Sequence, residues 1–400
     1  MLSNNVFPHQ AAGILRSPRS ITVMGSTGSV GKSTVDLLKR SPELFIVEAL
    51  TANRNVELLA KQAVELNAKL AVVADSNKYN ELKLALSGTG IEVGAGPEAI
   101  LEAAIRPSDM VMAAIVGFAG LAPTLTAIRR GATILLANKE ALVCAGDLMV
   151  HEVEKHGAKL LPVDSEHNAI FQVFDCENRA AIEHITLTAS GGPFRLYSAS
   201  QMANVTPEQA LAHPNWDMGS KISIDSASMV NKGLELIEAA YLFDLPENKI
   251  KVLVHPQSII HSMVSYVDGS VLAQLGDPDM RTPIACALAW PERIHTPVKQ
   301  LDLAEVATLT FENPDCERFP ALNLARRALK EEKTVIFNAA NEVAVDNFLK
   351  KNISFSAISV MVEKAITDFV TPSHDTLEKI IELDKEVRIW SADIIKRKMI

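Results

Sequence analysis

The chain has 400 residues, which at about 150 residues per domain predicts two or three domains and excludes a single small binding module. Apolar residues make up 48% of the chain and charged residues 22%, a balance that is typical of folded proteins and excludes a disordered chain. The formal net charge of −9 leaves no overall positive field for a nucleic acid or an anionic membrane, so we expect neither as a partner.

The N-terminal end and the cysteines bear on the location of the protein. Residues 1–20 contain Arg16 and Arg19 and no acidic residue, as organelle transit peptides do, but they lack the apolar core of a signal peptide. We expect a disordered leader there rather than a targeting segment. The 4 cysteines are too widely spaced for CxxC motifs and too sparse for a secreted disulfide framework, which favours the reduced cytoplasm.

From residue 20 onward, short apolar runs alternate with helical patterns. This alternation is typical of right-handed βαβ units, so we expect an open, doubly wound parallel sheet of the Rossmann type that ends near residue 163. The predicted strands cover 21–24, 45–51, 70–74, 110–115 and 133–137, and the predicted helices cover 32–40, 56–66 and 122–130.

The pattern changes after residue 163. Alternating runs predict strands over 185–190, 251–254, 262–267 and 270–275, with Asp268-Gly269 as a hairpin turn between the last two. Prolines interrupt 290–315, which we interpret as a linker, and amphipathic helices follow over 321–330, 339–350 and 357–368. The predicted α/β protein therefore has a Rossmann-like dinucleotide domain over 21–163, an α+β domain over 164–289, a linker over 290–316 and a helical bundle domain over 317–400.

A glycine-rich turn, Gly25-Ser-Thr-Gly28-Ser-Val-Gly31, follows the first predicted strand and directly precedes a helix. Small residues there let the backbone approach a pyrophosphate, and the N–H groups at the helix N-terminus favour its negative charge. A Walker A loop is excluded, because five residues rather than four separate Gly25 from Gly31. The spacing also departs from GxGxxG, which leaves a tight structural turn as the alternative, but the strand before it and the helix after it favour a dinucleotide.

The tip of the second predicted strand carries Asn53-Arg54-Asn55. An NAD enzyme usually places an acid there against the ribose 2′-hydroxyl, and an NADP enzyme places a basic group there against the 2′-phosphate. Arg54 therefore favours NADP. Glu48 is the alternative acid for NAD, although it lies within the predicted strand rather than at its tip.

Two carboxylates, Asp164 and Glu166, emerge two residues apart from an apolar run. Carboxylates suit a hard cation such as Mg²⁺ or Mn²⁺, although acids after a strand also commonly cap the next helix. We choose Glu235 as the third carboxylate, because Asn231 and Glu235 lie one helical turn apart on the same face of a predicted helix.

Two further groups of residues suggest a bound phosphate and an electrostatic group. Ser226, Asn231 and Lys232 at a helix start predict a monophosphate pocket, with Ser190-Gly191-Gly192 as a second such turn. The alternative is that Asn231 and Lys232 are ordinary surface groups. Lys139 follows the strand 133–137, where ligands of open α/β folds bind, and is either an electrostatic group of the site or a solvated lysine.

The polar loop that contains His213, Trp216 and Met218 has no apolar periodicity. It is either a packed loop or a lid that excludes water from the site.

Long blocks of the sequence resemble one enzyme family. They are GSTGSVG at 25, ANKEALV at 137, PVDSEHNAIFQ at 162, SGGPF at 190, HPNWDMG at 213, KISIDSASMVNKGLELIEA at 221, HPQSIIHSMV at 255 and DGSVLAQLGDPDMRTPIA at 268. From about residue 21 the chain is similar over nearly its whole length to the 1-deoxy-D-xylulose 5-phosphate reductoisomerases. The resemblance implies NADPH, a divalent metal (Mg²⁺, Mn²⁺ or Co²⁺), a homodimer, a middle domain for catalysis and dimerisation, and the product 2-C-methyl-D-erythritol 4-phosphate of the non-mevalonate isoprenoid pathway.

The resemblance also implies roles for individual residues. The metal ligands are Asp164, Glu166 and Glu235, and with Lys139 they are the catalytic residues. The substrate contacts are Lys139, Ser165, Glu166, Ser190, His213, Trp216, Met218, Ser226, Asn231, Lys232 and Glu235, of which Ser190, Ser226, Asn231 and Lys232 bind the phosphate and His213, Trp216 and Met218 form a closing flap. The NADPH contacts are Thr27, Gly28, Ser29, Val30, Asn53, Arg54, Asn55, Asn138, Glu140 and Gly219. Many members carry Gly-Lys at the positions of Asn53-Arg54, so the charge there is kept while its geometry changes.

These residues suggest a reaction and two alternatives to it. We expect the metal to act as a Lewis acid on the ketone and the neighbouring hydroxyl, and so to stabilise the enediolate of a retro-aldol cleavage before NADPH reduces the resulting aldehyde. Glu166 or Lys139 could assist the proton transfers. The alternatives are an ordinary NADP-dependent dehydrogenase of a phosphorylated hydroxy acid and a dinucleotide-sensing binding protein. Four catalytic candidates in one chain argue against the sensor, because a sensor has no need of a metal site.

Overall fold

The computed structural model describes residues 17–212, 216, 219–371 and 374–400. The chain divides into two compact units. The first unit comprises Met1–Ala141, Met149–Asn168 and Asp279–Val298, and the second comprises Leu142–Leu148, Ala169–Pro278 and Lys299–Ile400. No helix among the described residues is long and apolar enough to cross a membrane.

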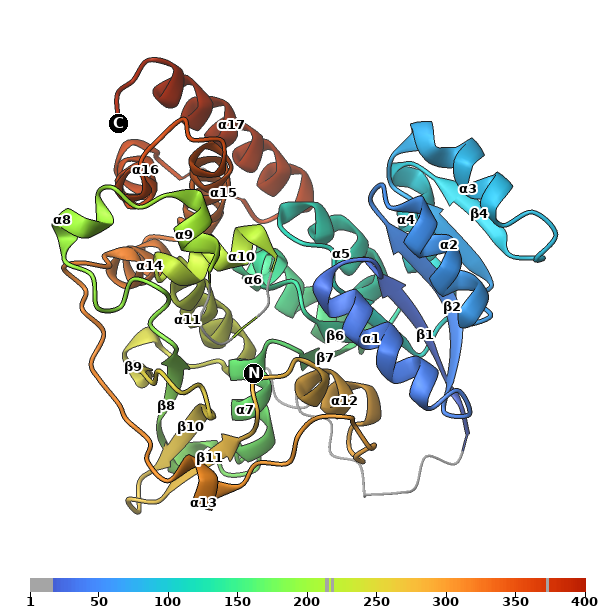
Figure 1. Ribbon diagram of the computed structural model, residues 1–400, viewed down its shortest axis with the longest axis horizontal. Coiled ribbons are helices and arrows are strands. Elements are labelled where there is room, and N and C mark those ends of the chain that lie inside the picture. The colour runs from blue at the N-terminus through green and yellow to red at the C-terminus, as the bar shows by residue number, and fades with distance from the viewer. Residues whose placement is uncertain (1–16, 213–215, 217–218, 372–373) are drawn as a thin grey trace. The chain divides into compact units, whose positions relative to one another are not determined.

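The elements of the first unit that precede residue 169 alternate along the chain and are coloured blue to green in Figure 1, whereas its helix α12 (Arg281–Ala289) is gold. Its strands are β1 (Arg19–Met24), β2 (Phe45–Ala52), β3 (Leu70–Val73), β4 (Glu92–Ala95), β5 (Met110–Ala113), β6 (Thr133–Leu136) and β7 (Lys159–Pro162). Its helices are α1 (Ser29–Arg40), α2 (Val56–Glu65), α3 (Tyr79–Ala85), α4 (Pro97–Ile105), α5 (Leu121–Arg129) and α12 (Arg281–Ala289), with 3₁₀ turns η1 (Ser76–Lys78) and η2 (Phe118–Gly120). Helix α6 (Lys139–His156) begins and ends in this unit.

The seven strands form one parallel sheet in the order β4-β3-β2-β1-β5-β6-β7. Successive strands move outward from β1 to β4 and then, in the opposite direction, from β5 to β7, so the predicted doubly wound sheet is confirmed. Right-handed crossovers place α1 and α2 on one face of the sheet and α4 and α5 on the other (Figure 1). Because the winding reverses between β1 and β5, ligands of such a fold bind at the carboxyl ends of these two strands.

A returning segment completes the first unit. Helix α12, which is more than 240 residues later in the chain than α1, packs against α1 and against the ends of β6 and β7. Arg19 at the start of β1 donates from Nη1 to the carbonyl oxygen of Trp290 at 3.0 Å, directly after α12 ends. The first unit is therefore built from segments far apart in the sequence.

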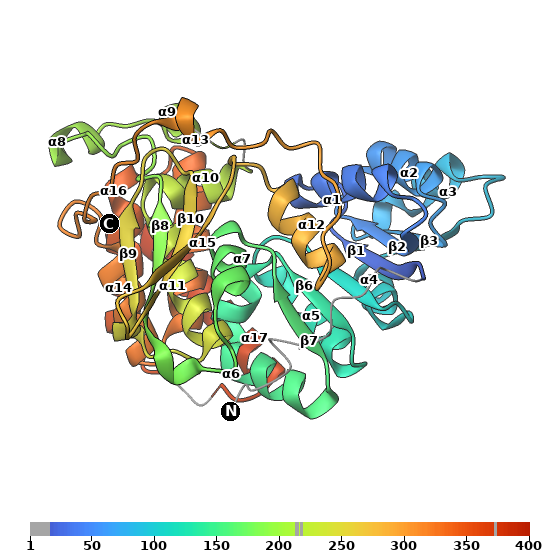
Figure 2. The ribbon, with the colours of Figure 1, turned by 90° about the horizontal axis from the view of Figure 1, so that it is seen from below.

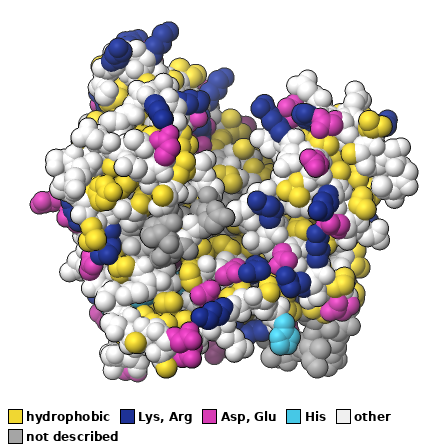
Figure 3. Space-filling view, in the orientation of Figure 1, with side chains coloured by type: hydrophobic (Ala, Val, Ile, Leu, Met, Phe, Trp, Pro, Cys, Tyr) yellow, Lys and Arg dark blue, Asp and Glu magenta, His cyan; other side chains and the backbone are white. Residues whose placement is uncertain are grey.

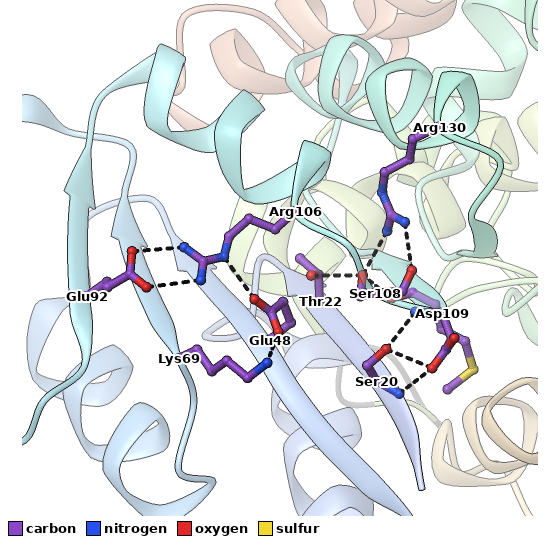
Figure 4. Close-up of polar contacts among 10 residues, drawn as sticks. Ser20, Thr22, Glu48, Lys69, Glu92, Arg106, Ser108, Asp109 and Arg130 are labelled. Carbon is purple, nitrogen blue, oxygen red and sulfur yellow. Dashed lines mark hydrogen bonds and ion pairs between the residues drawn. The ribbon is translucent and has the colours of Figure 1, made fainter. Parts of the chain in front are cut away.

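A polar network ties together the N-terminal ends of the strands (Figure 4). Ser20 donates from both its backbone N–H and its hydroxyl to Asp109 Oδ2, each at 2.7 Å. The prediction of a leader up to residue 20 is thus wrong for its last two residues, because β1 begins at Arg19 and is held by these bonds. The rest of the predicted leader, apart from 17–18, lies outside the described residues.

A second, separate group of polar contacts fixes the place of Glu48 in the first unit (Figure 4). Glu48 lies in the middle of β2 and is 4% exposed. Its carboxylate accepts from Lys69 Nζ at 2.6 Å and from Arg106 Nε at 3.0 Å. Burial by itself would raise the pKa of Glu48, but these two cations lower it. The Glu48 carboxylate is therefore engaged in a structural ion pair away from the strand tip.

The second unit contains a smaller sheet and most of the later helices. Its strands are β8 (Ile182–Ala189), β9 (Ile250–Val254), β10 (Ile260–Tyr266) and β11 (Val271–Leu275), in the order β11-β10-β8-β9. Its helices are α8 (Ala199–Met202), α9 (Pro207–Leu211), α10 (Ser220–Ala227), α11 (Val230–Phe243), α13 (Leu303–Val306), α14 (Ala321–Lys330), α15 (Thr334–Leu349), α16 (Phe355–Asp368) and α17 (Leu377–Lys396), and η3 (Arg179–Ala181) and η4 (Glu247–Lys249) are short turns. Helix α7 (Ser165–Val173) begins in the first unit and ends in the second.

Apolar faces hold the second unit together. Helix α11 packs against β8 and β9, and α14 packs on α11 (Figure 2). Strands β10 and β11 form the predicted antiparallel hairpin, and Gly269 at its turn has a φ of +88°, which glycine adopts without strain. The α/β class with a Rossmann-like sheet, a mixed sheet and C-terminal helices is confirmed.

Several elements differ from their prediction for identifiable reasons. Helix α15 begins at Thr334, five residues before its predicted start, because Val335, Ile336 and Phe337 are buried core residues rather than part of a loop. The predicted linker contains the short helix α13 and a bridge between Val254 and Glu312. On the face drawn in Figure 3, basic and acidic side chains are interspersed rather than gathered by sign.

Candidate functional site

The glycine turn lies where the winding of the large sheet reverses. Gly25 follows β1 with a φ of +88°, and a Cβ on it would lie 2.6 Å from the carbonyl oxygen of Ala114, directly after β5. A Cβ on Gly31 would lie 2.2 Å from the carbonyl oxygen of Gly25. Both positions therefore exclude side chains, and the backbone is tightly folded on itself.

The helix after this turn presents its N-terminus without a protein cap. Gly28 is the N-cap of α1, and no side chain among the described residues bonds to the first N–H groups of that helix. Gly28 and Ser29 are exposed and Thr27 and Val30 are partly exposed, so a nucleotide can reach them. Backbone donors that point out of a helix N-terminus suit a pyrophosphate.

The tip of β2 presents three exposed residues to the same edge of the sheet. Asn53, Arg54 and Asn55 follow the strand directly, and the Asn55 side chain caps α2 by accepting from Leu58 N at 3.1 Å. Arg54 Nε lies 3.1 Å from Asp75 Oδ2, at the tip of the neighbouring strand β3. A cation is thus present where the 2′-phosphate of NADP binds in folds of this kind.

Lys139 is placed by the cap of its own helix. Asn138 is the N-cap of α6, accepts from Ala141 N at 3.1 Å and donates to the Gly117 carbonyl oxygen at 3.0 Å. This cap fixes the first helical residue, Lys139, whose side chain is 5% exposed and forms an ion pair with Asp164. The interpretation of Lys139 as a solvated lysine is therefore wrong. Glu140, a predicted NADPH contact, is buried beside it.

Two carboxylates lie at the carboxyl end of β7, next to the end of β6. The backbone N–H of Glu166 donates to Asp164 Oδ1 at 3.2 Å, and Ser165 Oγ donates to Glu166 Oε2 at 2.6 Å. His167 Nδ1 lies 3.2 Å from Asp164 Oδ1. Burial by itself would raise the pKa of Asp164, but Lys139 and His167 lower it well below its usual range. Asp164 is therefore a carboxylate anion at neutral pH.

The second unit folds two polar turns against each other. Gly192 has a φ of +68°, and a Cβ on it would lie 2.9 Å from the carbonyl oxygen of Ser226. The loop Ser190-Gly191-Gly192 therefore approaches the backbone at the C-terminal end of α10 as closely as glycine allows. Within the loop, Ser190 Oγ accepts from Gly192 N at 3.2 Å.

Helix α11 is preceded by a residue in the left-handed backbone conformation, and polar side chains of its first turns contact one another. Met229 has a φ of +61° and is the N-cap of the helix. Asn231 Nδ2 donates to Glu235 Oε1 at 2.5 Å, and Lys232 Nζ forms an ion pair with the other oxygen of Glu235. The side chains of Lys232 and Glu235 are 4% and 1% exposed. A buried carboxylate is thus held by one amide and one cation of the same helix.

Helix α10, which carries Ser226, is anchored to a C-terminal helix by charge. Asp225 is fully buried, and its carboxylate accepts from Asn341 Nδ2 of α15 at 2.8 Å and lies 2.7 Å from Lys221 Nζ. Asn341 is also fully buried. Such a contact fixes the direction in which the residues after α10 emerge.

His261 is a site residue that the sequence reasoning missed. It lies on β10, is 6% exposed, and its ring centroid is 6.1 Å from that of Trp216. Burial is the main cause that lowers the pKa of His261 to about 4, with the charge of Lys232 as a smaller cause, so the ring is neutral. The block HPQSIIHSMV contained it, but a histidine within a strand pattern gives no sign of its neighbours.

The structure gathers the predicted residues in two groups. The first unit holds the glycine turn, the β2 tip, Lys139, Asp164, Ser165 and Glu166 at the carboxyl edge of one sheet. The second unit holds Ser190, Trp216, Gly219, Ser226, Asn231, Lys232 and Glu235. Gly219 is the exposed N-cap of α10. The flap residues His213 and Met218 lie outside the described residues.

Comparison with known proteins identifies the family by sequence. Residues 21–146 match the family model described as 1-deoxy-D-xylulose 5-phosphate reductoisomerase, residues 160–243 its C-terminal domain, and residues 275–390 the DXP reductoisomerase C-terminal domain. The chain is 57% identical to the 1-deoxy-D-xylulose 5-phosphate reductoisomerase of Rhodospirillum centenum, over 94% of each chain. It is 54% identical to that of Zymomonas mobilis, over 96% of this chain and 99% of the relative.

Solved structures agree with the sequence comparison. The reductoisomerase from Zymomonas mobilis in complex with NADPH matches with a TM-score of 0.90 and 53% identity, over 95% of this chain and 99% of that one. A DOX-P reductoisomerase in complex with NADPH, fosmidomycin and magnesium matches with a TM-score of 0.91 and 43% identity, over 94% of this chain and 98% of that one. The chain belongs to the 1-deoxy-D-xylulose 5-phosphate reductoisomerase family.

Proposed function

We propose that this chain binds NADPH and a divalent metal and converts 1-deoxy-D-xylulose 5-phosphate to 2-C-methyl-D-erythritol 4-phosphate. The observation that supports this most is the buried Lys139–Asp164 ion pair at the same sheet edge as the glycine turn. A buried cation and carboxylate beside a nucleotide turn suit a reaction in which negative charge develops on substrate oxygens.

The glycine turn and the residues around it fit NADPH. The cradle has no room for side chains at Gly25 and Gly31, and its helix N-terminus has no side-chain cap. We assign the pyrophosphate to Thr27, Gly28, Ser29 and Val30, the 2′-phosphate end to Asn53, Arg54 and Asn55, and the nicotinamide end to Asn138, Glu140 and Gly219. Both solved relatives named above are in complex with NADPH, and the second also contains magnesium.

The donors of the proposed metal site are carboxylate oxygens only, which fits Mg²⁺, Mn²⁺ or Co²⁺ better than a softer metal. Asp164 is held ionised by Lys139 and His167, Glu166 is oriented by Ser165, and Glu235 is oriented by Asn231 and Lys232. We propose that these three carboxylates hold one metal ion together. When bound, that metal supplies Lewis-acid polarisation of the substrate's carbonyl and hydroxyl oxygens.

The residues of the chain then have separate tasks. Ser190, Ser226, Asn231 and Lys232 bind the phosphate of the substrate, and the buried neutral ring of His261 excludes water beside them. Lys139 and Ser165 contact the reacting carbons, where the Lys139 ammonium stabilises negative charge on oxygen. Trp216, with His213 and Met218, covers the bound substrate. Glu166 or Lys139 holds the proton that must move during the carbon rearrangement.

A second copy of the chain and a cytoplasmic location complete the proposal. Strand β11 is at an edge of the small sheet, its residues Val271 and Leu272 are 54% and 50% exposed, and Val267 before the hairpin turn is 65% exposed. An apolar sheet edge of this kind supports a homodimer through 255–275. The 4 cysteines, all among the described residues, form no disulfide, as is usual in the cytoplasm.

The test follows NADPH oxidation with 1-deoxy-D-xylulose 5-phosphate, with Mn²⁺ or with a chelator, and identifies the carbon skeleton of the product. Metal-dependent oxidation that yields the branched methylerythritol phosphate supports the proposal. Oxidation that yields an unbranched product would indicate an ordinary dehydrogenase. No oxidation by folded protein that binds NADPH would contradict the reaction altogether.

Glu235→Gln separates metal binding from cofactor binding. We expect a loss of at least about 10²-fold in metal-dependent turnover, since a neutral amide is a poor ligand for a hard cation, and an unchanged affinity for NADPH. The matched control is Glu183→Gln, which removes an exposed carboxylate from β8. Turnover of Glu235→Gln at the level of the control would refute the ligand role.

A further inference from the structure

The tips of β2 and β3 together form a charged pair beside the proposed ribose site. The β2 tip, where an NAD enzyme usually carries its acid, holds Asn53, Arg54 and Asn55 and no acid. An acidic residue instead follows the neighbouring strand, β3. Asp75 follows β3 by two residues, and its backbone N–H donates to the Asn53 carbonyl oxygen at 3.1 Å, so the two tips are joined by their backbones.

The carboxylate of Asp75 is itself held in a defined position. Its Oδ1 accepts from the backbone N–H and the side-chain amide of Asn77, each at 3.0 Å, and so caps the turn η1. Its other oxygen, Oδ2, lies 3.1 Å from Arg54 Nε. The Asp75 side chain is 18% exposed and that of Arg54 is 76% exposed. A partly buried anion, held in place by Asn77, thus lies against an exposed cation.

The contact uses the inner nitrogen of the guanidinium. Among the ion pairs of the described residues, Asp75 is the one partner of Arg54, its nearest guanidinium atom is Nε, and the Arg54 side chain is largely exposed. Two parallel Nη donors match two oxygens of a phosphate group, whereas an ammonium offers a single point of charge. A lysine at this position could not bind the carboxylate and present a fork at the same time.

We propose that Asp75 is a positioning residue that selects NADPH over NADH, by holding Arg54 at Nε so that its two Nη groups bind the ribose 2′-phosphate. This inference rests on the proposed use of NADPH. Arginine has high side-chain entropy when exposed, and a partner that orders it beforehand lowers the entropy lost on binding. NADH lacks the 2′-phosphate and gains nothing from the ordered fork.

The negative charge of Asp75 also lies near that phosphate and would repel it if it were unneutralised. Arg54 neutralises the charge on one side, and the two N–H donors of Asn77 stabilise it on the other. We therefore expect the ordering effect to exceed the repulsion. The two effects have opposite signs, so one substitution distinguishes them.

The experiment measures equilibrium binding of NADPH and of NADH, from cofactor fluorescence, to the full chain without metal or substrate. The variants are Asp75→Asn, Arg54→Ala and the double variant. The matched control is Glu81→Gln, which removes one nearby negative charge from an exposed pair with Lys78. Binding does not depend on turnover, so it reports on the inference separately from the reaction.

We expect Asp75→Asn to weaken NADPH binding about fivefold and NADH binding less than about twofold, the scale of an exposed ion pair. We expect Arg54→Ala to weaken NADPH binding by about twentyfold or more, and the double variant to bind no more weakly than Arg54→Ala, because Asp75 acts through Arg54. Glu81→Gln should leave both affinities unchanged.

Three outcomes would overturn the inference. Asp75→Asn could bind NADPH as tightly as the wild type or more tightly, which would mean that repulsion dominates. It could lose affinity for both cofactors equally, which would indicate a structural role only. The effects of the two substitutions could add in the double variant. If the wild type binds NADPH but forms no branched product, the proposed function fails while these binding ratios still decide the inference.

Discussion

His261 illustrates how a single buried ring depends on the charges around it. Its pKa is lowered to about 4, mainly by burial and secondarily by Lys232, whereas an unfolded histidine titrates near 6.5. The folded chain therefore binds a proton at His261 less readily than the unfolded chain does. Stability that is present at pH 7 is lost as the pH falls through the range from about 6.5 to about 4.

The measurement compares the free energy of unfolding in urea for the wild type and for His261→Gln. Between pH 7 and pH 5 the free energy of unfolding of the wild type should fall by roughly 2 kcal/mol more than that of the variant. The reason is that the unfolded wild type takes up a proton at His261 in this range, whereas the folded wild type does not. Equal losses in the two proteins would show that the pKa of His261 is not lowered in the folded state.

The sequence identified candidate residues for the site from their chemistry, but it did not reveal which of them contact one another. The carboxylates, the glycine turn and Arg54 carry their chemistry in the side chain or in its absence, so they could be chosen from the sequence. The ion pair of Lys139 with Asp164 could not, because β6 and β7 become neighbours only through pairing of the strands. Asp75 was missed for the same reason, since it reaches Arg54 from another strand.

At the scale of elements, the contact between α10 and α15 holds the helix that carries Ser226 of the proposed phosphate site. Asn341→Ala would remove the amide that donates to the buried Asp225 carboxylate. We expect a loss of about 2 to 3 kcal/mol in the free energy of unfolding, because a hydrogen bond to a buried charge is lost and its acceptor is left unsatisfied. The KM for the phosphorylated substrate should rise more than kcat falls, since α10 carries Ser226.

Thermal and urea denaturation with steady-state kinetics provide the measurement. Asn347→Ala on the same helix is the control, because its amide makes local contacts: it donates to the carbonyl oxygen of Val343 and accepts from the side chain of Asn352. A variant at Asn341 that is as stable as this control would show that the contact between the helices contributes little.

Elements with strong periodicity were predicted within a few residues, and those without it were not. The strands of the large sheet other than β4, and helix α14, follow their apolar runs closely. Strand β4 was missed because its four residues, Glu-Val-Gly-Ala, include one exposed acid and a glycine. Helix α17 was missed although it is 20 residues long, because charged residues interrupt its apolar face.

At the scale of the whole molecule, the edge of the small sheet bears on the oligomeric state. Leu272→Lys places a charge on β11, where a leucine is 50% exposed. If this edge forms the proposed homodimer, the variant should be a monomer at concentrations where the wild type is a dimer, with an unchanged circular dichroism spectrum. Light scattering after size exclusion measures the mass. A dimeric variant would place the interface elsewhere. The division into domains over 21–163, 164–289 and 317–400 stays a prediction.

The return of α12 to the first unit has a consequence for the newly made chain. Arg19 on β1 donates to the carbonyl oxygen of Trp290, which is synthesised 271 residues after it. At a synthesis rate of about 5 to 20 residues per second, that delay is on the order of tens of seconds. During this time the face of α1 that α12 will cover, with the ends of β6 and β7, stays open to the crowded cell. A nascent chain that ends near residue 163 would therefore expose the apolar surface that α12 covers in the complete protein.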